Sequence, residues 1–293
     1  MTGAIDIALD DTVSGKTHTG ENFPVASLLI RPELRAPIMA FYRFARTADD
    51  IADGPHVAAE TKLALLARMR AGLDVSGQDG AGQNPGRNVR AAPEAIALNA
   101  AMAARRIDPV HAHDLLDAFV CDVGKTRYAD WDDLIGYCRL SAMPVGRYVL
   151  DVHGESRDLW PASDALCAAL QIINHLQDCA KDYRLLQRVY IPLDTGLNVA
   201  DLDQDRATPA LRAIIASLAR RTHGLLAQSA GFSAQIRDRR LAAEVAVIQR
   251  LAVSLCKRLE TRDPLSERVH HRKWQAALLA LGAAVPVLMR RGA

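Results

Sequence analysis

Aromatic residues are scarce in this chain of 293 residues, since Phe, Trp and Tyr together make up only 5%. Runs of Val, Ile and Tyr, which are typical of strands, are also rare. Ala and Leu are abundant, and apolar residues reach 49%, so the composition predicts an all-α fold with a substantial core. No solenoid repeat or low-complexity linker divides the chain. We therefore expect one all-α domain over residues 21–291, after a flexible N-terminus at residues 1–20.

Three further absences exclude other classes of protein. The five cysteines are odd in number and form no Cys-x-x-Cys, which indicates reduced thiols and not a disulfide framework or a zinc site. The net charge is +2 and no basic tract stands out, so we expect no nucleic-acid partner. Residues 1–11 lack the basic start and apolar segment of a secretory signal, which predicts a cytoplasmic protein.

Long apolar runs are missing as well. The most apolar segment, residues 276–289, is shorter than the roughly 20 residues that a membrane-spanning helix needs. We interpret it as a terminal helix of the core. Trp274 precedes it, and basic residues flank it: Arg272, Lys273, Arg290 and Arg291. This combination leaves room for peripheral contact with the inner face of a membrane.

Apolar periodicity and prolines at helix starts predict nine helices. They cover residues 32–53, 57–73, 93–105, 109–123, 131–153, 161–187, 209–229, 242–261 and 271–289. Residues 76–86 are rich in glycine. They lack the Gly-x-x-x-x-Gly-Lys-Ser/Thr spacing of a phosphate-binding loop and follow no predicted strand, so they predict a connection between helices.

Two Asp-x-x-x-Asp pairs lie far apart in the chain, each within a predicted helix. The first is Asp49 and Asp53, and the second is Asp178 and Asp182. Residues four apart share a helix face, so each pair directs two carboxylates the same way despite their repulsion. Mg²⁺ prefers such oxygen ligands and, when held by few carboxylates, commonly binds a phosphate too. One pair alone is more often a solvated face, but two facing pairs predict a metal-bridged diphosphate site.

Each aspartate pair belongs to a longer polar stripe on one helix face. The first stripe is Tyr42, Arg46, Asp49 and Asp53, and the second is Gln171, Asn174, Asp178 and Asp182. Both stripes run through segments rich in Ala, Leu, Ile and Phe. Burying such a polar line is costly unless each group is paired or bound to a ligand. The stripes therefore favour a binding site over ordinary packing.

Four segments of the sequence resemble the squalene/phytoene synthase family. They are residues 41–53, residues 137–146, the set Asn174, Asp178 and Asp182, and residues 188–192, in family order. The resemblance covers roughly residues 20 to 290. It implies a single-domain isoprenoid synthase fold in which helices surround a deep apolar central cavity, with the aspartate pairs at its mouth.

The resemblance also implies roles for individual residues. Mg²⁺ would be held by Asp49, Asp53, Asn174, Asp178 and Asp182. The four aspartates and Tyr137 would be catalytic, Tyr42 and Arg46 would contact diphosphate, and Gln171, Arg188 and Tyr190 would line the site. Aromatic faces can stabilise a carbocation, which makes Phe23, Phe41, Phe44 and Tyr137 candidates, although core packing explains each of them equally well.

Residues 20–27, together with the stretch to Asp53, are similar to the hydroxysqualene synthase branch of the family. That likeness implies conversion of presqualene diphosphate and water to hydroxysqualene and diphosphate, with functional coupling to other enzymes of the squalene pathway. Gln177 stands where members that condense two prenyl diphosphates usually carry Arg, and residues 141–144 depart from the usual middle segment. Loss of an Arg removes a bidentate phosphate ligand, which favours a substrate with one diphosphate.

Two alternatives remain open. One is a head-to-head synthase that makes presqualene diphosphate or squalene from farnesyl diphosphate, and the other is a non-enzymatic helical carrier of an apolar ligand. Asp122 and Tyr137 are candidates for holding the water that ends the reaction. We expect His175, which follows Asn174, to face away from the second stripe.

Overall fold

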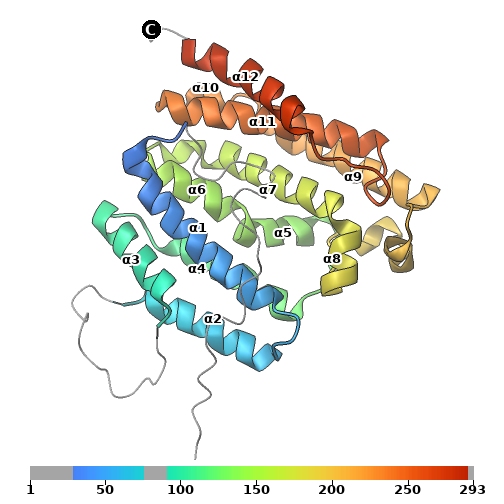
Figure 1. Cartoon of the computed structure of the whole chain (residues 1–293), viewed down its shortest axis with the longest axis horizontal. Coiled ribbons are helices and arrows are strands. Elements are labelled where there is room, and N and C mark those ends of the chain that lie inside the picture. The colour runs from blue at the N-terminus through green and yellow to red at the C-terminus, as the bar shows by residue number, and fades with distance from the viewer. Residues whose placement is uncertain (1–28, 76–90, 290–293) are drawn as a thin grey trace, which may run out of the picture.

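This computed structural model describes residues 29–75 and 91–289. Those ranges contain helices and no strand, which confirms the all-α prediction. Phe23, the N-terminal residues 1–20 and the glycine-rich residues 76–86 lie outside the described residues. Figure 1 shows the helices α1 (Pro32–Asp53), α2 (Ala59–Leu73), α3 (Pro93–Arg105), α4 (Val110–Gly124), α5 (Trp131–Ser141), α6 (Met143–Val152), α7 (Trp160–Gln177), α8 (Cys179–Leu186), α9 (Pro209–Gln228), α10 (Phe232–Gln235), α11 (Arg239–Thr261) and α12 (Lys273–Met289). Short 3₁₀ turns are η3 (Arg157–Leu159), η4 (Leu193–Thr195) and η5 (Val199–Asp203).

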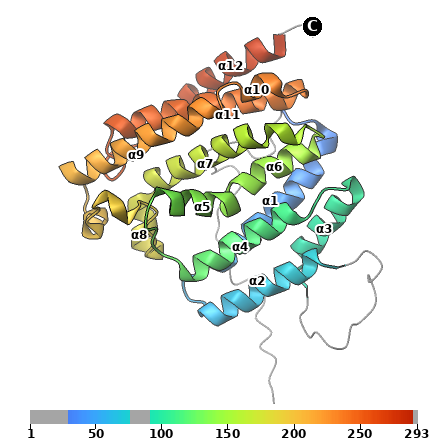
Figure 2. The same cartoon turned by 180° about the vertical axis from the view of Figure 1, so that it is seen from behind.

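The helices pack around two groups of buried apolar side chains. One group joins α1, α2, α3 and α4, with contributions from α6. The other joins α5, α7, α9 and α11. Figures 1 and 2 show α12 outermost beside α11, and α2 and α3 at the opposite side of the molecule. The two groups therefore meet where α1, α4 and α6 approach α5 and α7, at the centre of the fold.

Helix α1 illustrates how the sequence positions the site. Phe41, Phe44, Ala48 and Ile51 recur every three or four residues and are buried. Burying side chains as large as these contributes about 1.5–3 kcal/mol each, which fixes the rotation of the helix about its axis. The stripe that begins at Tyr42 lies on a neighbouring face and so stays beside the core without entering it.

The predicted helix over residues 131–153 is wrong as one element, because α5 ends at Ser141 and α6 begins at Met143. Ala142 separates them with φ −118° and ψ −46°. Pro144 provides the physical reason, since it lacks an N–H and its ring clashes with the carbonyl four residues earlier. Proline is best tolerated in the first turn of a helix, where Pro144 lies in α6.

The predicted helix over residues 161–187 is also divided, because α7 ends at Gln177 and α8 begins at Cys179. Asp178 forms the junction, with φ −102° and ψ 9°. The hydrogen bonds nevertheless continue across it, from Asp178 N to Asn174 O at 2.9 Å and from Asp182 N to Asp178 O at 2.8 Å. The three polar residues therefore keep nearly helical spacing although they belong to two helices.

Smaller differences occur at other helix ends. Helix α11 begins at Arg239 and not at residue 242, because the Asp238 carboxylate caps it by accepting from Arg240 N at 2.9 Å and Leu241 N at 3.3 Å. Outside the helices, Val189 N donates to Thr126 O at 2.9 Å. This contact holds the segment that carries Arg188 and Tyr190 against the end of α4. No helix in the described part of the chain is both long enough and apolar enough to cross a bilayer.

Candidate functional site

A polar cavity of about 400 Å³ lies where the two groups of helices meet. Its lining comes from α1, α4, α5, α6, α7, α8, the junction residue Asp178, and the segment that carries Arg188 and Tyr190. Every predicted site residue in the described part of the chain contributes to it except the cation-stabilising candidates Phe41, which lines a second cavity, and Phe44, which is buried in the core. The residues that contribute are Tyr42, Arg46, Asp49, Asp53, Tyr137, Gln171, Asn174, Asp178, Asp182, Arg188 and Tyr190. The structure thus brings both stripes to one cavity, while their individual roles stay predictions.

On α1, arginines already engage the carboxylates. Arg46 Nη1 donates to Asp49 Oδ2 at 2.8 Å, and Arg46 Nη2 donates to Asp50. Arg188 Nη1 donates to Asp53 Oδ1 at 2.6 Å. Asp50 was not part of the predicted pair, but it lies one turn before Gly54 and shares Arg46 with Asp49. The stripe on α1 therefore presents carboxylates whose charge is partly offset.

On α7 and α8, the basic side chains lie further from the carboxylates. Lys181 Nζ is 3.6 Å from Asp178 Oδ2, and the Lys181 side chain is half exposed. His175 Nδ1 is 3.9 Å from Asp182 Oδ2. Burial lowers the pKa of His175, although Asp182 opposes the shift, so the imidazole is neutral near pH 7. The second stripe is therefore the more negative of the two.

Arg188 and Asp122 form the buried centre between the stripes. Arg188 is 6% exposed and, besides its bond to Asp53, donates to the Asp122 backbone oxygen at 3.1 Å. The Tyr137 hydroxyl donates to Asp122 Oδ2 at 2.7 Å. Burial raises the pKa of Asp122 to about 6, while Arg188 and the Tyr137 hydrogen bond act in the opposite direction. From the sequence, Asp122 is only a candidate for holding the water that ends the reaction, and no spacing pattern links it to Tyr137 or Arg188.

Three aromatic rings of one cluster, those of Tyr137, His175 and Tyr190, line the cavity. His175 stacks on Tyr190 with ring centroids 3.4 Å apart, and Tyr190 stacks on Tyr128 at 5.3 Å. Tyr137 lies 5.7 Å from Tyr190. The expectation that His175 faces away from the stripe is wrong, because Gln171 Nε2 lies 3.0 Å from His175 Nε2 and His175 lines the cavity. Sequence spacing missed this because the stacking partner Tyr190 comes from a separate segment.

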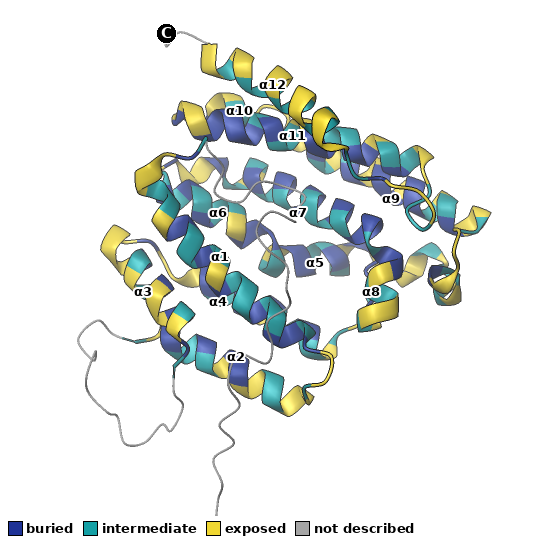
Figure 3. Cartoon of the chain, in the orientation of Figure 1, coloured by how far each residue is buried: buried dark blue, intermediate teal, exposed yellow. Residues whose placement is uncertain are grey.

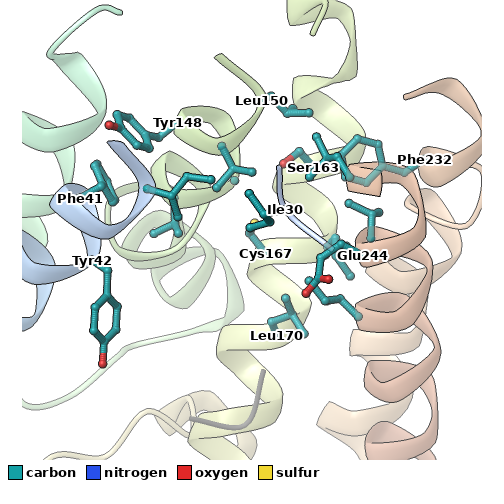
Figure 4. Close-up of a pocket in the computed structure, with 18 of the residues that line it drawn as sticks. Ile30, Phe41, Tyr42, Tyr148, Leu150, Ser163, Cys167, Leu170, Phe232 and Glu244 are labelled. Atoms are coloured by element: carbon teal, nitrogen blue, oxygen red, sulfur yellow. The ribbon is translucent and has the colours of Figure 1, made fainter. Parts of the chain in front are cut away.

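A second cavity, of about 280 Å³ and almost wholly apolar, adjoins the first (Figure 4). Tyr42, Ala45 and Val145 line both cavities. Gly146 also lines the apolar cavity, and a Cβ there would collide with Ser163 Oγ and Cys167 Sγ. Glycine thus permits close packing of α6 on α7. An apolar cavity inside the helices, with the aspartates beside it, agrees with the predicted arrangement.

The donor set fits a metal ion that a substrate helps to bind. Within the described residues, no three His, Cys, Asp or Glu side chains come close enough to hold a metal by themselves. The four aspartates nevertheless line one cavity and offer only oxygen donors. Mg²⁺ usually keeps waters and binds through one or two carboxylates plus substrate phosphates. The chemistry of this set therefore fits Mg²⁺ shared with a diphosphate better than a preformed protein cage.

Gln177 does not lie where the sequence argument placed it, beside a bound diphosphate. It is 7% exposed and does not line the polar or the apolar cavity in the described residues. The neighbouring Asp178 lines the polar cavity, because successive residues at helical spacing point in different directions. Gln177 therefore adds no phosphate ligand to either cavity, and the inference that its presence favours a single diphosphate stays a prediction.

Comparison with known proteins places the chain in a family. The model of the squalene/phytoene synthase family matches residues 16–275. Hydroxysqualene synthase from Zymomonas mobilis is 52% identical over 93% of this chain and 90% of its own length. Hydroxysqualene synthase from Rhodopseudomonas palustris is 50% identical over 95% and 92%, respectively.

Solved structures agree with this placement. A squalene synthase, HpnC from Alicyclobacillus acidocaldarius, superposes with a TM-score of 0.63 at 28% identity, covering 80% of this chain and 85% of that one. A dehydrosqualene synthase superposes with a TM-score of 0.71 over 92% of each chain, and at 21% identity this likeness concerns the fold alone. The aspartate-lined cavity, the helical fold and these matches lead to one conclusion: the chain belongs to the squalene/phytoene synthase family.

Proposed function

We propose that this protein converts presqualene diphosphate and water to hydroxysqualene and diphosphate. The observation that carries the proposal is a polar cavity, lined by four aspartates, that shares a wall with an apolar cavity. Such a pair suits an amphiphile with a charged head and a hydrocarbon body. The name of the relatives at 50% and 52% identity supports hydroxysqualene as the product.

The diphosphate is assigned to the polar cavity. Mg²⁺ bound between Asp49, Asp53, Asp178, Asp182 and Asn174 would neutralise negative charge on the departing diphosphate. Arg46 lies at the same cavity and adds a guanidinium suited to phosphate oxygens. Arg188 is held by Asp53 and Asp122, so it fixes the position of the first stripe. These groups are arranged before substrate arrives, which reduces the reorganisation needed when charge develops.

The hydrocarbon is assigned to the apolar cavity. Phe41 and Tyr148 stack there with centroids 4.2 Å apart, and both rings line the cavity. An apolar lining keeps bulk water from a carbocation until it has rearranged. Tyr137 and Tyr190 border the polar side, and burial raises the pKa of each hydroxyl, so both rings remain neutral at the site. Their faces can stabilise a nearby cation.

Product analysis tests the proposal with three separate inputs: presqualene diphosphate, farnesyl diphosphate alone, and farnesyl diphosphate with NADPH. We expect hydroxysqualene from the first input without NADPH, at a much higher rate than any turnover of the other two. Oxygen from ¹⁸O-labelled water should appear in the alcohol. Formation of squalene that requires NADPH, or comparable turnover of farnesyl diphosphate alone, would contradict it.

We also propose that α12 rests on a membrane surface that contains anionic lipid. Its outer face is apolar, with Trp274, Leu278 and Leu281 each about 60% exposed: 59%, 62% and 61%. No charged residue occurs from 274 to 289, whereas Arg272 and Lys273 precede the helix. Figure 3 shows this exposed face on the outermost helix. Apolar residues with a Trp and basic residues at one end fit an anionic interface.

Vesicle flotation tests the membrane proposal. The protein should float with vesicles that contain phosphatidylglycerol and bind less to purely zwitterionic vesicles. Leu278→Glu with Leu281→Glu should abolish flotation, while Ile96→Glu on α3, an equally apolar residue that is 42% exposed, should leave it unchanged. Flotation that survives the double change would contradict the assignment of α12. The functional coupling to other squalene-pathway enzymes stays a prediction.

A further inference from the structure

Glu244 is the one charged residue among the described residues that line the apolar cavity. It is 4% exposed and comes from α11, a helix that carries none of the predicted site residues. Leu241, Val245 and Ile248 line the cavity from the same helix face, at the spacing of an apolar stripe. Glu244 therefore occupies a position where helix packing alone would select a Leu or an Ile.

The side chain is directed toward the space between α7 and α11. Figure 4 draws the Glu244 carboxylate on the cavity side of α11, near Leu170. Leu170 lines the apolar cavity, and the next residue along α7, Gln171, lines the polar one. The carboxylate thus lies in the apolar cavity at a level of α7 where the two cavities adjoin.

Burying a carboxylate in an apolar environment is costly, and a hydrophobic residue of similar volume is often at least as stable there. Another buried glutamate of this chain has a clear structural purpose. Glu155 accepts from Arg237 N at 3.1 Å and from Asp238 N at 2.8 Å, and so anchors the start of α11. Glu244 differs from Glu155 in its location, because its side chain lines the apolar cavity.

We propose that Glu244 binds the water that ends the reaction and accepts its proton; this inference rests on the proposed function. In that step a lone pair of the water oxygen forms the C–O bond to the rearranged carbocation. One O–H bond of the water breaks, its electron pair stays on oxygen, and the proton passes to a Glu244 carboxylate oxygen. The products are the neutral alcohol and a neutral Glu244 carboxyl group, so atoms and charge balance.

This assignment differs from the two candidates that the sequence offered. Tyr137 and Asp122 are bonded to each other at the polar cavity, beside Arg188. A water held there would lie on the diphosphate side of the substrate. A water held by Glu244 would lie in the apolar cavity, beside the hydrocarbon part of the substrate. Among the described residues that line this cavity, no other charged side chain could accept its proton.

The test separates ionisation from water capture. Purified wild type, Glu244→Gln and Glu244→Leu are each given presqualene diphosphate with Mg²⁺, and diphosphate release and organic products are measured together. We expect both variants to release diphosphate within about threefold of wild type. The hydroxysqualene formed per diphosphate should fall by about 10²-fold, the lower end of what a positioned base contributes. Elimination products and isomeric alcohols should replace it.

Three controls make the outcome decisive. Glu244→Leu keeps the volume and apolar character of the wall, so it gives an answer if Glu244→Gln does not fold. Glu244→Asp, which keeps a carboxylate, should restore part of the hydroxysqualene fraction. Glu155→Gln removes a buried carboxylate outside the cavities and should lower the melting temperature without changing the product ratio.

A wild-type product ratio in Glu244→Gln or Glu244→Leu would overturn the inference. Loss of diphosphate release in both folded variants would also overturn it, because Glu244 would then act before water capture. If the wild type releases no diphosphate from presqualene diphosphate, the proposed function itself fails. That result is distinct from both outcomes for the variants.

Discussion

The two aspartate stripes face the same cavity but are built differently. On α1, the helix is continuous and arginines bond to Asp49 and Asp53 at 2.8 and 2.6 Å. At the junction of α7 and α8, the helix is interrupted at Asp178, and the basic side chains that approach Asp178 and Asp182, Lys181 and the neutral His175, are 3.6 and 3.9 Å away. The first stripe lies on a continuous helix and its charge is partly neutralised. The second stripe crosses a helix junction and is more negative.

This difference indicates which stripe depends more on an added cation. Carboxylates that already accept charge-assisted hydrogen bonds have part of their charge satisfied by the protein. The Asp178 and Asp182 carboxylates have weaker partners, so bound metal would relieve more repulsion there. We infer that α1 supplies a fixed wall and that α7 and α8 respond to the ligand. Four experiments test this difference between the stripes.

Breaking the support of the first stripe should have the largest effect. Arg188→Met leaves the Asp53 carboxylate and the buried Asp122 without their shared cation, and losing one partner of a buried pair costs about 3–5 kcal/mol. Urea unfolding should reveal that loss. Arg184→Met, which removes a bond to Asp203 at 3.2 Å on an exposed surface, should cost no more than about 1 kcal/mol. Equal losses in the two variants would argue against a buried centre.

Removing one charge from the second stripe should mainly affect catalysis. Asp178→Asn keeps the shape of the side chain, so circular dichroism should be unchanged. We expect kcat/KM to fall by about 10²–10³-fold, or roughly 3–4 kcal/mol, because a group that stabilises the developing charge is lost. Asp203→Asn, a surface aspartate that is 67% exposed, should retain wild-type activity. Near-normal turnover of Asp178→Asn at saturating Mg²⁺ would contradict the proposal that the two stripes share a metal site.

Metal and diphosphate should bind cooperatively, with a coupling of about 1–3 kcal/mol. Carboxylates that face one another repel until a cation arrives, and diphosphate needs that cation in turn. Calorimetry should therefore show tight diphosphate binding with Mg²⁺ and weak binding in EDTA. Asp182→Asn should reduce the coupling more than Asp53→Asn, because Arg188 already offsets part of the Asp53 charge. Equal affinity with and without Mg²⁺ would indicate a basic site that needs no metal.

The sequence predicted the parts of the site that follow helical periodicity. Asp49 and Asp53 share a face of one continuous helix, and a spacing of four residues was enough to recognise it. Local proline chemistry could have located the end of α5, because Pro144 has no N–H to continue the hydrogen bonds of the preceding helix. The break at Asp178 has no such signal, since Asn174, Asp178 and Asp182 keep helical spacing and hydrogen bonds across it.

Contacts between distant segments could not be predicted in this way. His175 faces the cavity because Tyr190, from a segment beyond α8, stacks on it. Arg188 reaches Asp53 from 135 positions away, which no local pattern encodes. Glu244 did leave a sequence signal, a charge within an apolar helical stripe, but only the packing of α11 against α7 places it in a cavity.

The smallest expected effect is a change in the pKa of Asp122, whose carboxyl group interacts electrostatically with aspartates of both stripes. Burial raises the pKa of Asp122 to about 6, and Asp53 and Asp182 raise it further, with Asp53 the larger of the two, while Arg188 lowers it. Asp53→Asn should therefore lower the pKa of Asp122 more than Asp182→Asn does. The reason is that Asp53→Asn also removes the carboxylate that competes with Asp122 for Arg188. Carboxyl ¹³C NMR titration in EDTA would measure both shifts.

The sign of the accompanying stability change follows from linkage. The native pKa of Asp122, about 6, lies above the ordinary value of 3.8 for an aspartate, so the native state binds the proton more tightly. This contribution, about 3 kcal/mol at most, is fully present below about pH 4 and is lost as pH rises to about 6. Unfolding free energies of wild type relative to Asp122→Asn should decline over that window, and the decline should be smaller in the Asp53→Asn background. Parallel pH profiles for wild type and Asp122→Asn would mean that Asp122 does not titrate between the stripes.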